Sequence, residues 1–429
     1  MLERERIIHS AVFPGAMAFT EVKTVEKVLQ TLFEKRAIYK GEYEGLYCVA
    51  CEQFRHENEL VDGRCPDHDI VLEKVKEECY LLKMADIQSE LVKRIENREP
   101  ASPAGGFRIE PERYKREVLS FLKNEKLKDI SISRKNVKWG IPLPFDKEHT
   151  TYVWADAFLN YLTGLEWDGD ANFFQSPTFP LPRWNRGNSS KSDFSNLSFW
   201  PPDIQLIGKD ILRVHATIWP IMLMHLGIPL PKMLYVHGHI LSRGRKMSKT
   251  LGNAIFIDEM LEKFGVDGTR YLLMSAGTFG EDVDMTMERM VEKYNADLAN
   301  GLGNLVSRVV KLVGNLQLAI SNSDLIQNSK FKIQNYLTDL EINQALEYIW
   351  GIIREDDKFI EENKPWELAK KDEKKFQEVM KKLVSDLRLI ADLLVPFMPN
   401  TSEKIKKALE EKKAEILFPR IKHYTETRN

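Results

Sequence analysis

The chain has 429 residues, of which 43% are hydrophobic and 29% are charged. This balance predicts a globular protein with roughly two to four domains and excludes a disordered tail. The formal net charge is −2, so a nucleic-acid partner would have to meet local basic patches, because no overall positive field attracts it. The sequence has no run of about 18 apolar residues, so no membrane-spanning helix is predicted.

The amino-terminal region and the cysteines bear on the compartment. Residues 11–19 contain a small-residue pattern that could pass for a cleavage site, but Pro14 and Gly15 interrupt it, so we predict no signal peptide. Three of the four cysteines fall within residues 48–65. This clustering fits a metal site in a reducing compartment better than a disulfide framework. We therefore expect a cytoplasmic protein.

In chain order, residues 21–40 carry apolar side chains at helical spacing and predict an amphipathic helix that ends in a β-rich turn. The next stretch, to about residue 139, contains the cysteines and a helical segment at residues 111–122. From residue 140 to about 290, strand-like and helical runs alternate, which predicts βα units on a parallel sheet. The strand-like runs are residues 150–156, 203–208 and 233–240, and the main helical run is residues 211–227.

From residue 291 to the end the apolar period is helical almost throughout, which predicts a helix bundle. Residues 176–196 are rich in Ser, Asn and Pro and predict a surface loop.

A short-spaced cysteine pattern is the most specific local signal. Cys48 and Cys51 form one pair, and Cys65 and His68 form a second pair thirteen residues later. Three sulfurs and an imidazole at this spacing predict a closed, tetrahedral, structural zinc site. The alternative is that the cysteines pack as small hydrophobic residues. With four protein ligands the Zn²⁺ has no open position, so we expect it to act in folding; Cys79 is expected in the core.

A basic loop follows the last strand-like run, in the sequence SRGRKMSKTLGN at residues 242–253. Lys246 and Lys249 flank Met247 and Ser248, and two ammonium groups on flexible stems can converge on a polyphosphate. Ligands bind at strand ends in open α/β sheets, which favours a triphosphate here. A solvated basic turn is the alternative, and this stretch alone does not decide between them.

Several motifs in one order resemble a known family. KMSKT resembles the KMSKS signature of class I aminoacyl-tRNA synthetases. TTYVWADAFLNY, LIGKDILRVHATIWP and NKPWELAKK, together with WGIPLP before them, are similar to methionyl-tRNA synthetases in particular. The likeness runs from about residue 21 to the end, and several motifs in register are far more specific than any one of them.

The resemblance implies an α/β fold with an incomplete class I nucleotide-binding (Rossmann-like) domain, a connective insert bearing the zinc knuckle, and an all-α anticodon-binding bundle. Residues 1–40 would be a remnant of the amino-terminal half of the catalytic domain, and residues 41–139 the insert. Residues 140–290 would be the carboxyl-terminal half with the KMSKT loop, and residues 291–429 the anticodon-binding domain.

The activity implied is that of a methionine–tRNA ligase. ATP with Mg²⁺ and methionine would give methionyl adenylate and pyrophosphate, and the acyl group would pass to the terminal adenosine of tRNA(Met). Lys246 and Lys249 would stabilise charge developing on the phosphates, an electrostatic role. The ATP-binding positions implied are His237, Gly238, Lys246, Ser248 and Lys249.

An aromatic pocket for the methionine side chain is also implied. A polarizable thioether favours aromatic edges and has no hydrogen bond to demand, so a tight apolar box can select it. Asp210 matches the carboxylate that receives the α-ammonium group. The matching positions are Trp154, Ala157, Tyr161, Asp210, His215 and Trp219. Val214 and Phe158 depart from the family pattern in size, and ordinary core packing is the alternative for the tryptophans.

The resemblance places an anticodon-reading site in the helical region. Asn304 and Arg308 are four residues apart and so share a helix face, and Pro365 and Trp366 follow a later helix. An indole can stack on an unpaired base while an amide and a guanidinium read base edges. The alternative is that Asn304 caps a helix and Trp366 anchors packing.

The largest departure lies at the amino terminus, where residues 1–20 do not match the His-Ile-Gly-His sequence with which the family holds the ATP phosphates. We expect a fragment, an enzyme whose amino-terminal segment is supplied separately, or a tRNA-binding relative that is no longer an enzyme. A synthetase for another apolar amino acid is a further alternative. On this basis the chain alone is expected to lack methionine-dependent exchange of pyrophosphate into ATP.

Overall fold

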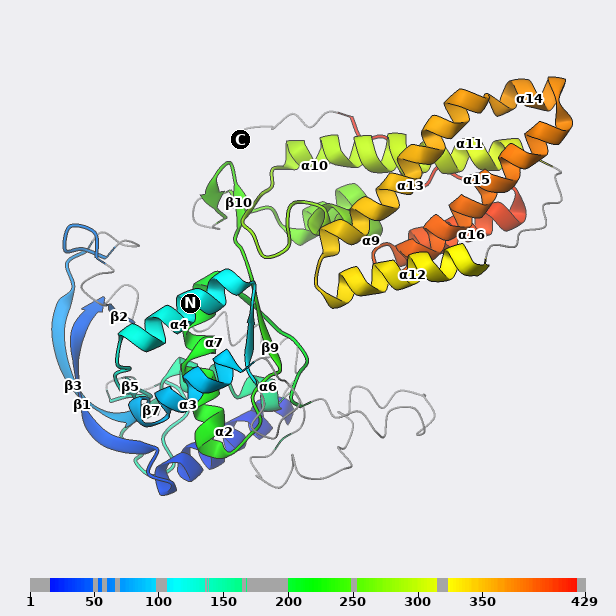
Figure 1. Cartoon of the computed structure of the whole chain (residues 1–429). Coiled ribbons are helices and arrows are strands. Elements are labelled where there is room, and N and C mark those ends of the chain that lie inside the picture. The colour runs from blue at the N-terminus through cyan, green and yellow to red at the C-terminus, as the bar shows by residue number, and fades with distance from the viewer. Residues whose placement is uncertain are drawn as a thin grey trace. The chain divides into compact units, whose positions relative to one another are not determined.

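The computed structural model describes residues 16–48, 53–55, 60–65, 70–97, 106–135, 137, 139–163, 167, 200–247, 253–314 and 323–422. The chain divides into two units, Met1–Val236 and His237–Asn429 (Figure 1). Each unit has a large apolar core of its own. Among the described helices, none is both long enough and apolar enough to cross a membrane.

The first unit mixes helices with short strands. Its elements are α2 (Ala16–Glu34), β1 (Ile38–Cys48), β2 (Gln53–Arg55), β3 (Glu73–Leu82), α3 (Ala85–Glu96), β4 (Arg108–Glu110), α4 (Glu112–Asn124), β5 (Ile130–Ser131), β6 (Ser133–Arg134), β7 (Thr150–Thr151), α5 (Val153–Ala157), α6 (Asn160–Thr163), β8 (Gln205–Gly208), the 3-10 turn η4 (Lys209–Ile211), α7 (Leu212–Ala216), α8 (Ile218–Leu226) and β9 (Met233–His237).

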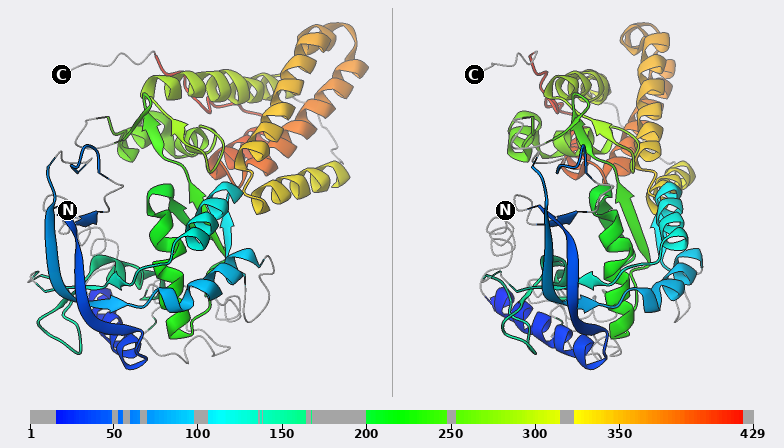
Figure 2. Two further views of the ribbon diagram at one scale, coloured as in Figure 1. Left: turned by 60° about the vertical axis from the view of Figure 1, so that its left-hand side comes forward. Right: turned by 90° about the vertical axis from the view of Figure 1, so that its left-hand side faces the viewer.

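A long antiparallel ribbon dominates the sequence that contains the cysteines. β1 and β3 pair from Ile38 opposite Leu82 to Tyr47 opposite Glu73, and the sheet order is β2-β1-β3-β5. Figure 2 shows the two strands running side by side along their length. Ion pairs cross the ribbon on its exposed face, including Lys76 with Glu42 at 2.8 Å. Opposite charges on neighbouring strands favour this register.

A second, three-stranded sheet belongs to the first unit. Its order is β4-β9-β8, and β4 runs parallel to β9 with Ile109 opposite Leu234. α7 and α8 follow β8 and lead into β9, which is the βα arrangement that the alternation of patterns predicts. β4 joins this sheet although it precedes residue 140.

Three local predictions differ from the structure. The helix predicted over residues 21–40 begins at Ala16 and ends at Glu34. The strand predicted over residues 150–156 was wrong for most of its length, because only Thr150–Thr151 is a strand and α5 follows. Helical geometry there places Trp154 and Phe158 on one face, and packing overrides the β propensity of the sequence. The run at residues 211–227 breaks at Thr217, three residues before Pro220, whose nitrogen has no hydrogen to donate.

The second unit begins with a small sheet and continues as helices, as predicted for its carboxyl-terminal part. Its elements are β10 (Ile240–Ser242), β11 (Arg245–Lys246), α9 (Ile257–Met274), β12 (Val283–Asp284), α10 (Met287–Lys293), the π-helical segment η5 (Tyr294–Leu302), α11 (Gly303–Val313), α12 (Ser323–Thr338), α13 (Ile342–Asn363), α14 (Pro365–Lys371), α15 (Glu373–Leu394) and α16 (Pro399–Glu411).

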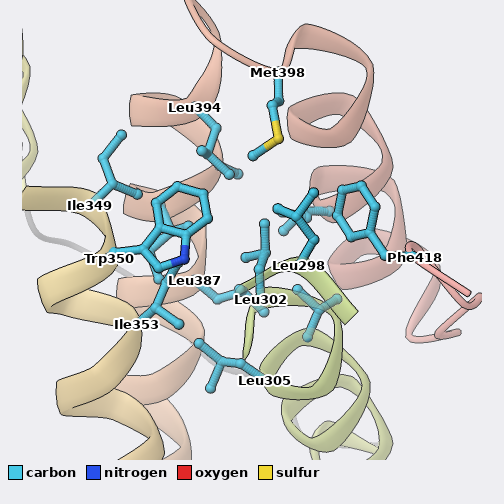
Figure 3. Close-up of a cluster of buried hydrophobic side chains, with 14 of the residues drawn as sticks. Leu298, Leu302, Leu305, Ile349, Trp350, Ile353, Leu387, Leu394, Met398 and Phe418 are labelled. Carbon is cyan, nitrogen blue, oxygen red and sulfur yellow. The ribbon is translucent and has the colours of Figure 1, made fainter. Parts of the chain in front are cut away.

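Apolar side chains from several helices meet in the core of this unit (Figure 3). Leu298 and Leu302 of η5 and Leu305 of α11 are fully buried, as is Leu387 of α15. The ring of Trp350 on α13 stacks on Tyr271 of α9 at 4.4 Å between centroids. Burial of this kind is the main source of stability for a bundle, and it fixes α13 against both α9 and α15.

Candidate functional site

Four predicted pocket residues lie together in the first unit. The rings of Trp154 and His215 are 6.3 Å apart at 82°, and those of Tyr161 and His215 are 6.0 Å apart at 71°. Tyr161 also lies 5.9 Å from Trp219. They come from α5, α6, α7 and α8. We call this group, together with Phe158, the aromatic box.

Phe158 is the residue that sequence reasoning noted only as a departure. It is buried, and it stacks on Trp219 at 5.5 Å and 17°. It also contacts Trp154 at 5.5 Å and meets His215 edge-on at 5.1 Å and 88°. The signal that could have identified it is its place four residues after Trp154, on the same helical face.

A hydrogen-bond chain fixes the imidazole of His215. Nδ1 lies 3.0 Å from the carbonyl oxygen of Ile211, which can only accept, so Nδ1 carries the proton. The other nitrogen, Nε2, therefore accepts from the Tyr161 hydroxyl at 3.1 Å. Burial lowers the pKa of His215, although the bond to Ile211 opposes the shift. The box thus presents a neutral imidazole among aromatic rings, which suits an uncharged, polarizable group.

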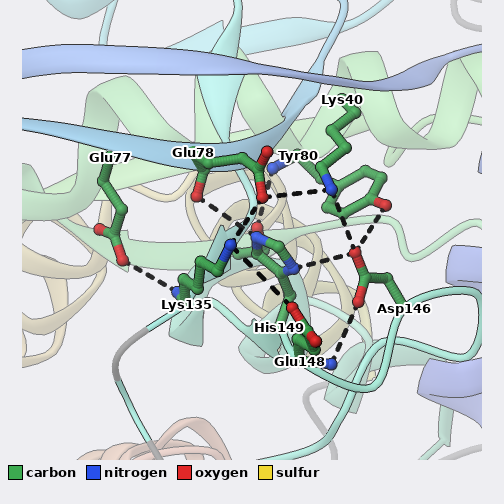
Figure 4. A network of polar contacts seen from close by, with 9 residues as sticks. Lys40, Glu77, Glu78, Tyr80, Lys135, Asp146, Glu148 and His149 are labelled. Carbon is green, nitrogen blue, oxygen red and sulfur yellow. Dashed lines mark hydrogen bonds and ion pairs between the residues drawn. The ribbon is translucent and has the colours of Figure 1, made fainter.

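A polar network around the buried His149 anchors the segment that leads into α5 (Figure 4). His149 is fully buried, with Nδ1 3.1 Å from Asp146 and Nε2 3.3 Å from the carbonyl oxygen of Glu78 on β3. Tyr80 donates its hydroxyl to Asp146 at 2.9 Å. Burial and this bond raise the pKa of Tyr80 to about 12. The network joins the ribbon to the chain just before Trp154.

The remaining predicted substrate positions lie at strand and helix ends. Asp210 is exposed on the 3-10 turn η4, directly after the carboxyl end of β8. Ala157 is the half-buried last residue of α5. Carboxyl ends of parallel strands are the usual ligand edge of such sheets, so Asp210 has the placement expected of a ligand-binding carboxylate.

His237 and Gly238 stand where β9 ends. Nδ1 of His237 lies 2.8 Å from the carbonyl oxygen of Gly238. A Cβ at Gly238 would overlap the backbone of Glu281 and Asp282. The glycine therefore has a packing role, which its sequence context did not reveal.

Lys246 lies on a tight hairpin in the second unit, formed by β10 and β11 (residues 240–246), which we call the basic hairpin. β10 and β11 pair with Leu241 opposite Lys246, and the turn residues Arg243 and Gly244 have φ of 54° and 74°. Positive φ at both central residues is the type I′ geometry, which glycine and few other residues adopt readily. Arg243 pairs with Glu288 at 3.3 Å. Ser248 and Lys249 lie outside the described residues, so the hairpin places only the first predicted lysine.

The predicted anticodon residues come from two helices of the bundle. Arg308 of α11 lies with its guanidinium carbon 5.7 Å from the centre of the Trp366 ring on α14, within cation–π range. Trp366 is 41% exposed, whereas Pro365 beside it is buried. Asn304 is exposed one turn before Arg308. The structure therefore presents an indole, a guanidinium and an amide on neighbouring elements.

Two carboxylates that sequence reasoning missed hold Arg308. Glu361 lies 2.6 Å from one of its terminal nitrogens, and Asp357 lies 3.8 Å from the other. Burial raises the pKa of Asp357, although Arg308 opposes the shift. Acidic residues four apart on the helix before Pro365 were the signal available in the sequence.

The described part of the cysteine cluster is compact. Cys48 and Cys65 are both buried and share a small apolar cluster with Leu72. Cys48 ends β1 opposite Gln53, and the N–H of Cys65 donates to the carbonyl of Ile70 at 2.9 Å. Four residues, 49–52, separate Cys48 from Gln53, and four, 66–69, separate Cys65 from Ile70. The predicted partners Cys51 and His68 are among these eight, which lie outside the described residues. Within the described residues, no three potential metal ligands are gathered.

Comparisons with known proteins agree on one family. The family model described as tRNA synthetases class I (M) matches residues 11–73 and 69–310, and that of the anticodon binding domain of methionyl tRNA ligase matches residues 317–425. The methionine–tRNA ligase of Clostridium acetobutylicum is 38% identical over 93% of this chain, and that of Clostridium tetani is 39% identical over 90%. The chain spans 63% and 58% of the length of these two relatives.

The fold is similar to a solved relative as well. Methionyl-tRNA synthetase of Mycobacterium tuberculosis in complex with methionyl-adenylate superposes with a TM-score of 0.74 at 29% identity, over 90% of this chain and 74% of that one. Since the first family model alone covers well over half of the residues, the chain belongs to the class I tRNA synthetases of the methionine type.

Proposed function

We propose that this chain belongs to a methionine–tRNA ligase and supplies its methionine-binding, phosphate-binding and anticodon-binding residues. ATP and methionine would form methionyl adenylate and pyrophosphate, and the methionyl group would then pass to the terminal adenosine of a tRNA with a CAU anticodon. The observation that carries the proposal is the aromatic box with its neutral His215. The names of the relatives and the adenylate in the solved neighbour support it.

The box would select the methionine side chain. Three aromatic rings, those of Trp154, Phe158 and Tyr161, lie around His215, and a thioether meets ring edges without requiring a hydrogen bond. The Tyr161 hydroxyl is already committed to Nε2 of His215. An amino acid with a hydroxyl or a charge would therefore lose its hydration and receive no hydrogen bond from that hydroxyl in return. Asp210, exposed beside this region, would receive the α-ammonium group.

The basic hairpin would act on ATP, which is bound with Mg²⁺ as a substrate. Lys246 would approach the phosphates together with Lys249, and Ser248, His237 and Gly238 would line the same region. Because the phosphates gain and redistribute negative charge as pyrophosphate leaves, fixed ammonium groups lower the barrier electrostatically. No side chain need form a covalent intermediate.

Anticodon reading would fall to the bundle. Trp366 offers an exposed ring on which an unpaired base can stack, and Arg308 is held beside it. Asn304, one turn away on α11, would read a base edge with its amide. Three unpaired bases can be read in this way without a duplex groove.

The cysteine cluster would hold one structural Zn²⁺. Cys48 and Cys65 are buried in one cluster, and each begins a short link that contains its partner, Cys51 or His68. Three thiolates and an imidazole are a ligand set that suits tetrahedral Zn²⁺. The metal, when bound, would cross-link the chain at Cys48 to the chain at Cys65, whose apolar cluster among the described residues is small.

The domain division would follow the family. We propose residues 1–40 and 140–290 as parts of the catalytic domain, residues 41–139 as its insert, and residues 291–429 as the anticodon-binding domain. The cytoplasm, where translation consumes charged tRNA and thiols stay reduced, is the proposed compartment. The surface loop predicted at residues 176–196 lies outside the described residues.

Amino-acid binding tests the proposal directly. Trp154 and Trp219 lie in the box, so methionine should change the tryptophan fluorescence and saturate, while leucine, isoleucine and valine should bind at least about tenfold more weakly. The His215→Ala variant should lose the signal, and the Tyr39→Phe variant, altered elsewhere in the same unit, should keep it. Tighter binding of another apolar amino acid would contradict the assignment.

A further inference from the structure

Asn343, in the first turn of α13, grips a loop of the same unit with both ends of its amide. Its Oδ1 accepts the N–H of Phe279 at 2.9 Å, and its Nδ2 donates to the carbonyl oxygen of Gly277. The side chain is half-buried. An amide that both donates and accepts in this way fixes the loop in one position.

The gripped loop is packed against β12. A Cβ at Gly277 would lie 2.9 Å from Val283 Cγ2, so the glycine backbone rests directly on that side chain. A displacement of Gly277 is therefore felt at β12, because packed interiors have little free volume.

β12 in turn is the parallel partner of the basic hairpin. The N–H of Val283 donates to the carbonyl oxygen of His239 at 2.9 Å, and the N–H of Met285 donates to the carbonyl oxygen of Leu241 at 2.8 Å. His239 donates its own N–H to Asp282 at 2.8 Å. Leu241 lies opposite Lys246 on β11. Direct contacts thus run from Asn343 through Gly277 and β12 to the strand that carries Lys246.

The other end of α13 lies beside the proposed anticodon residues Arg308 and Trp366. Asp357 and Glu361 on its last turns contact Arg308, and the helix ends at Asn363, before Trp366 on α14. β10 and α14 lie at opposite ends of this unit in Figure 1. A helix of 22 residues is about 33 Å long, and the stacking of Trp350 on Tyr271 stiffens its middle.

We propose that Asn343 is a positioning residue for the basic hairpin, and that α13 couples RNA bound at Arg308 and Trp366 to that hairpin. The inference rests on the proposed function, since it requires RNA at this face. RNA that stabilises α13 against local opening also stabilises the loop at Gly277 and Phe279, which Asn343 bonds to α13, and through that loop the β12–β10 pairing. The coupling is reciprocal, so a ligand that orders the hairpin strengthens RNA binding equally.

Hydrogen exchange of the whole chain tests this, with a CAU-anticodon stem–loop RNA as the probe. The amides of Val283 and Met285 close the β12–β10 pairing and report its local opening. In the unaltered chain the RNA should slow their exchange by roughly fivefold, the low end of typical coupling between sites. In Asn343→Ala the RNA should still bind, but the slowing should vanish.

Two further variants keep the test sharp. Gln344→Ala removes an exposed neighbouring amide and should behave as the unaltered chain does. Asn343→Asp keeps the acceptor for Phe279 but places a carboxylate against the Gly277 carbonyl, so it should retain less than half of the slowing. If RNA binds and slows exchange equally with and without Asn343, or binds without slowing it at all, the coupling is overturned while the anticodon site stands. If the RNA does not bind, the anticodon site fails and the coupling with it.

Discussion

Tyr161 and His215 form a hydrogen bond of 3.1 Å in which the hydroxyl donates to Nε2. The direction follows from the bond between Nδ1 and Ile211 at the other side of the ring. Both nitrogens are thereby used, and burial keeps the pKa of His215 below its ordinary value. Loss of the hydroxyl would leave a buried acceptor without a donor, which costs about 1–3 kcal/mol.

Tyr161→Phe should therefore weaken methionine binding by roughly 5- to 150-fold, the equivalent of that cost. A tryptophan-fluorescence titration measures the change. Tyr39→Phe removes a hydroxyl that donates to Asp129 at 2.7 Å in the same unit, and its methionine affinity should be unchanged. Equal losses in the two variants would show that the effect is general destabilisation.

Stability should fall as the pH drops below about 6.5, the ordinary pKa of histidine. The folded-state pKa of His215 is lowered, so between the folded and unfolded values the unfolded chain binds more protons. The contribution of neutral His215 to the free energy of unfolding is therefore fully present above the pKa of the unfolded state, and it is lost as the pH falls through the pKa of the folded state. Urea unfolding of the unaltered chain and of His215→Gln at pH 7.5 and 5.5 measures it. A pH slope that His215→Gln leaves unchanged would exclude His215 as its source.

Trp366→Ala should weaken binding of a CAU stem–loop by about 1–3 kcal/mol, the scale of one lost base stack. Fluorescence anisotropy with labelled RNA measures the affinity. Phe331→Ala is a matched control, because that aromatic side chain is also exposed, on α12 of the same unit, and it should bind normally. The unaltered chain should bind a scrambled anticodon far more weakly, and equal binding would remove the proposed site.

Protein purified without added metal should contain close to one equivalent of zinc by elemental analysis. Cys65→Ala should lose most of it, because three ligands hold Zn²⁺ much more weakly than four. Cys79→Ala is the control: this thiol on β3 is buried, as expected from the sequence, and its removal should leave the zinc content intact. A protein without zinc, or a Cys65→Ala variant that retains it, would refute the site.

Local periodicity explains which parts of this structure were predictable. The helices of the bundle follow from their apolar spacing, and Asn304 with Arg308 were correctly placed on one helix, α11, because an interval of four is a property of the helix itself. The prediction for the chain at Trp154 was wrong, since only long-range packing decides between strand and helix for TTYVWAD.

The role of Asn343 could not be predicted from the sequence. Its partners, Gly277 and Phe279, are more than sixty residues away, and no local pattern marks such a contact.

A charged contact joins α13 to α15. Asp356 is buried, and its Oδ1 accepts from Lys382 of α15 at 2.8 Å, while Lys382 also contacts Asp386 at 2.6 Å. Burial raises the pKa of Asp356 to about 7, although Lys382 opposes the shift. Lys382→Ala should destabilise the chain by about 1–3 kcal/mol, because it leaves a buried carboxyl without its donor.

That loss should be larger at pH 8 than at pH 5. A carboxyl whose folded pKa is raised binds more protons folded than unfolded, so its contribution to stability falls as the pH rises through that range. Removing Lys382 raises the folded pKa further and widens the range. Lys381→Ala, which alters an exposed neighbour, should change the unfolding free energy little at either pH. Asp356→Asn combined with Lys382→Ala should recover most of the loss at pH 8, since the amide carries no charge to bury. Urea unfolding at the two pH values measures all four proteins, and a loss in Lys382→Ala that is equal at both would show that the Asp356 carboxyl is not its cause.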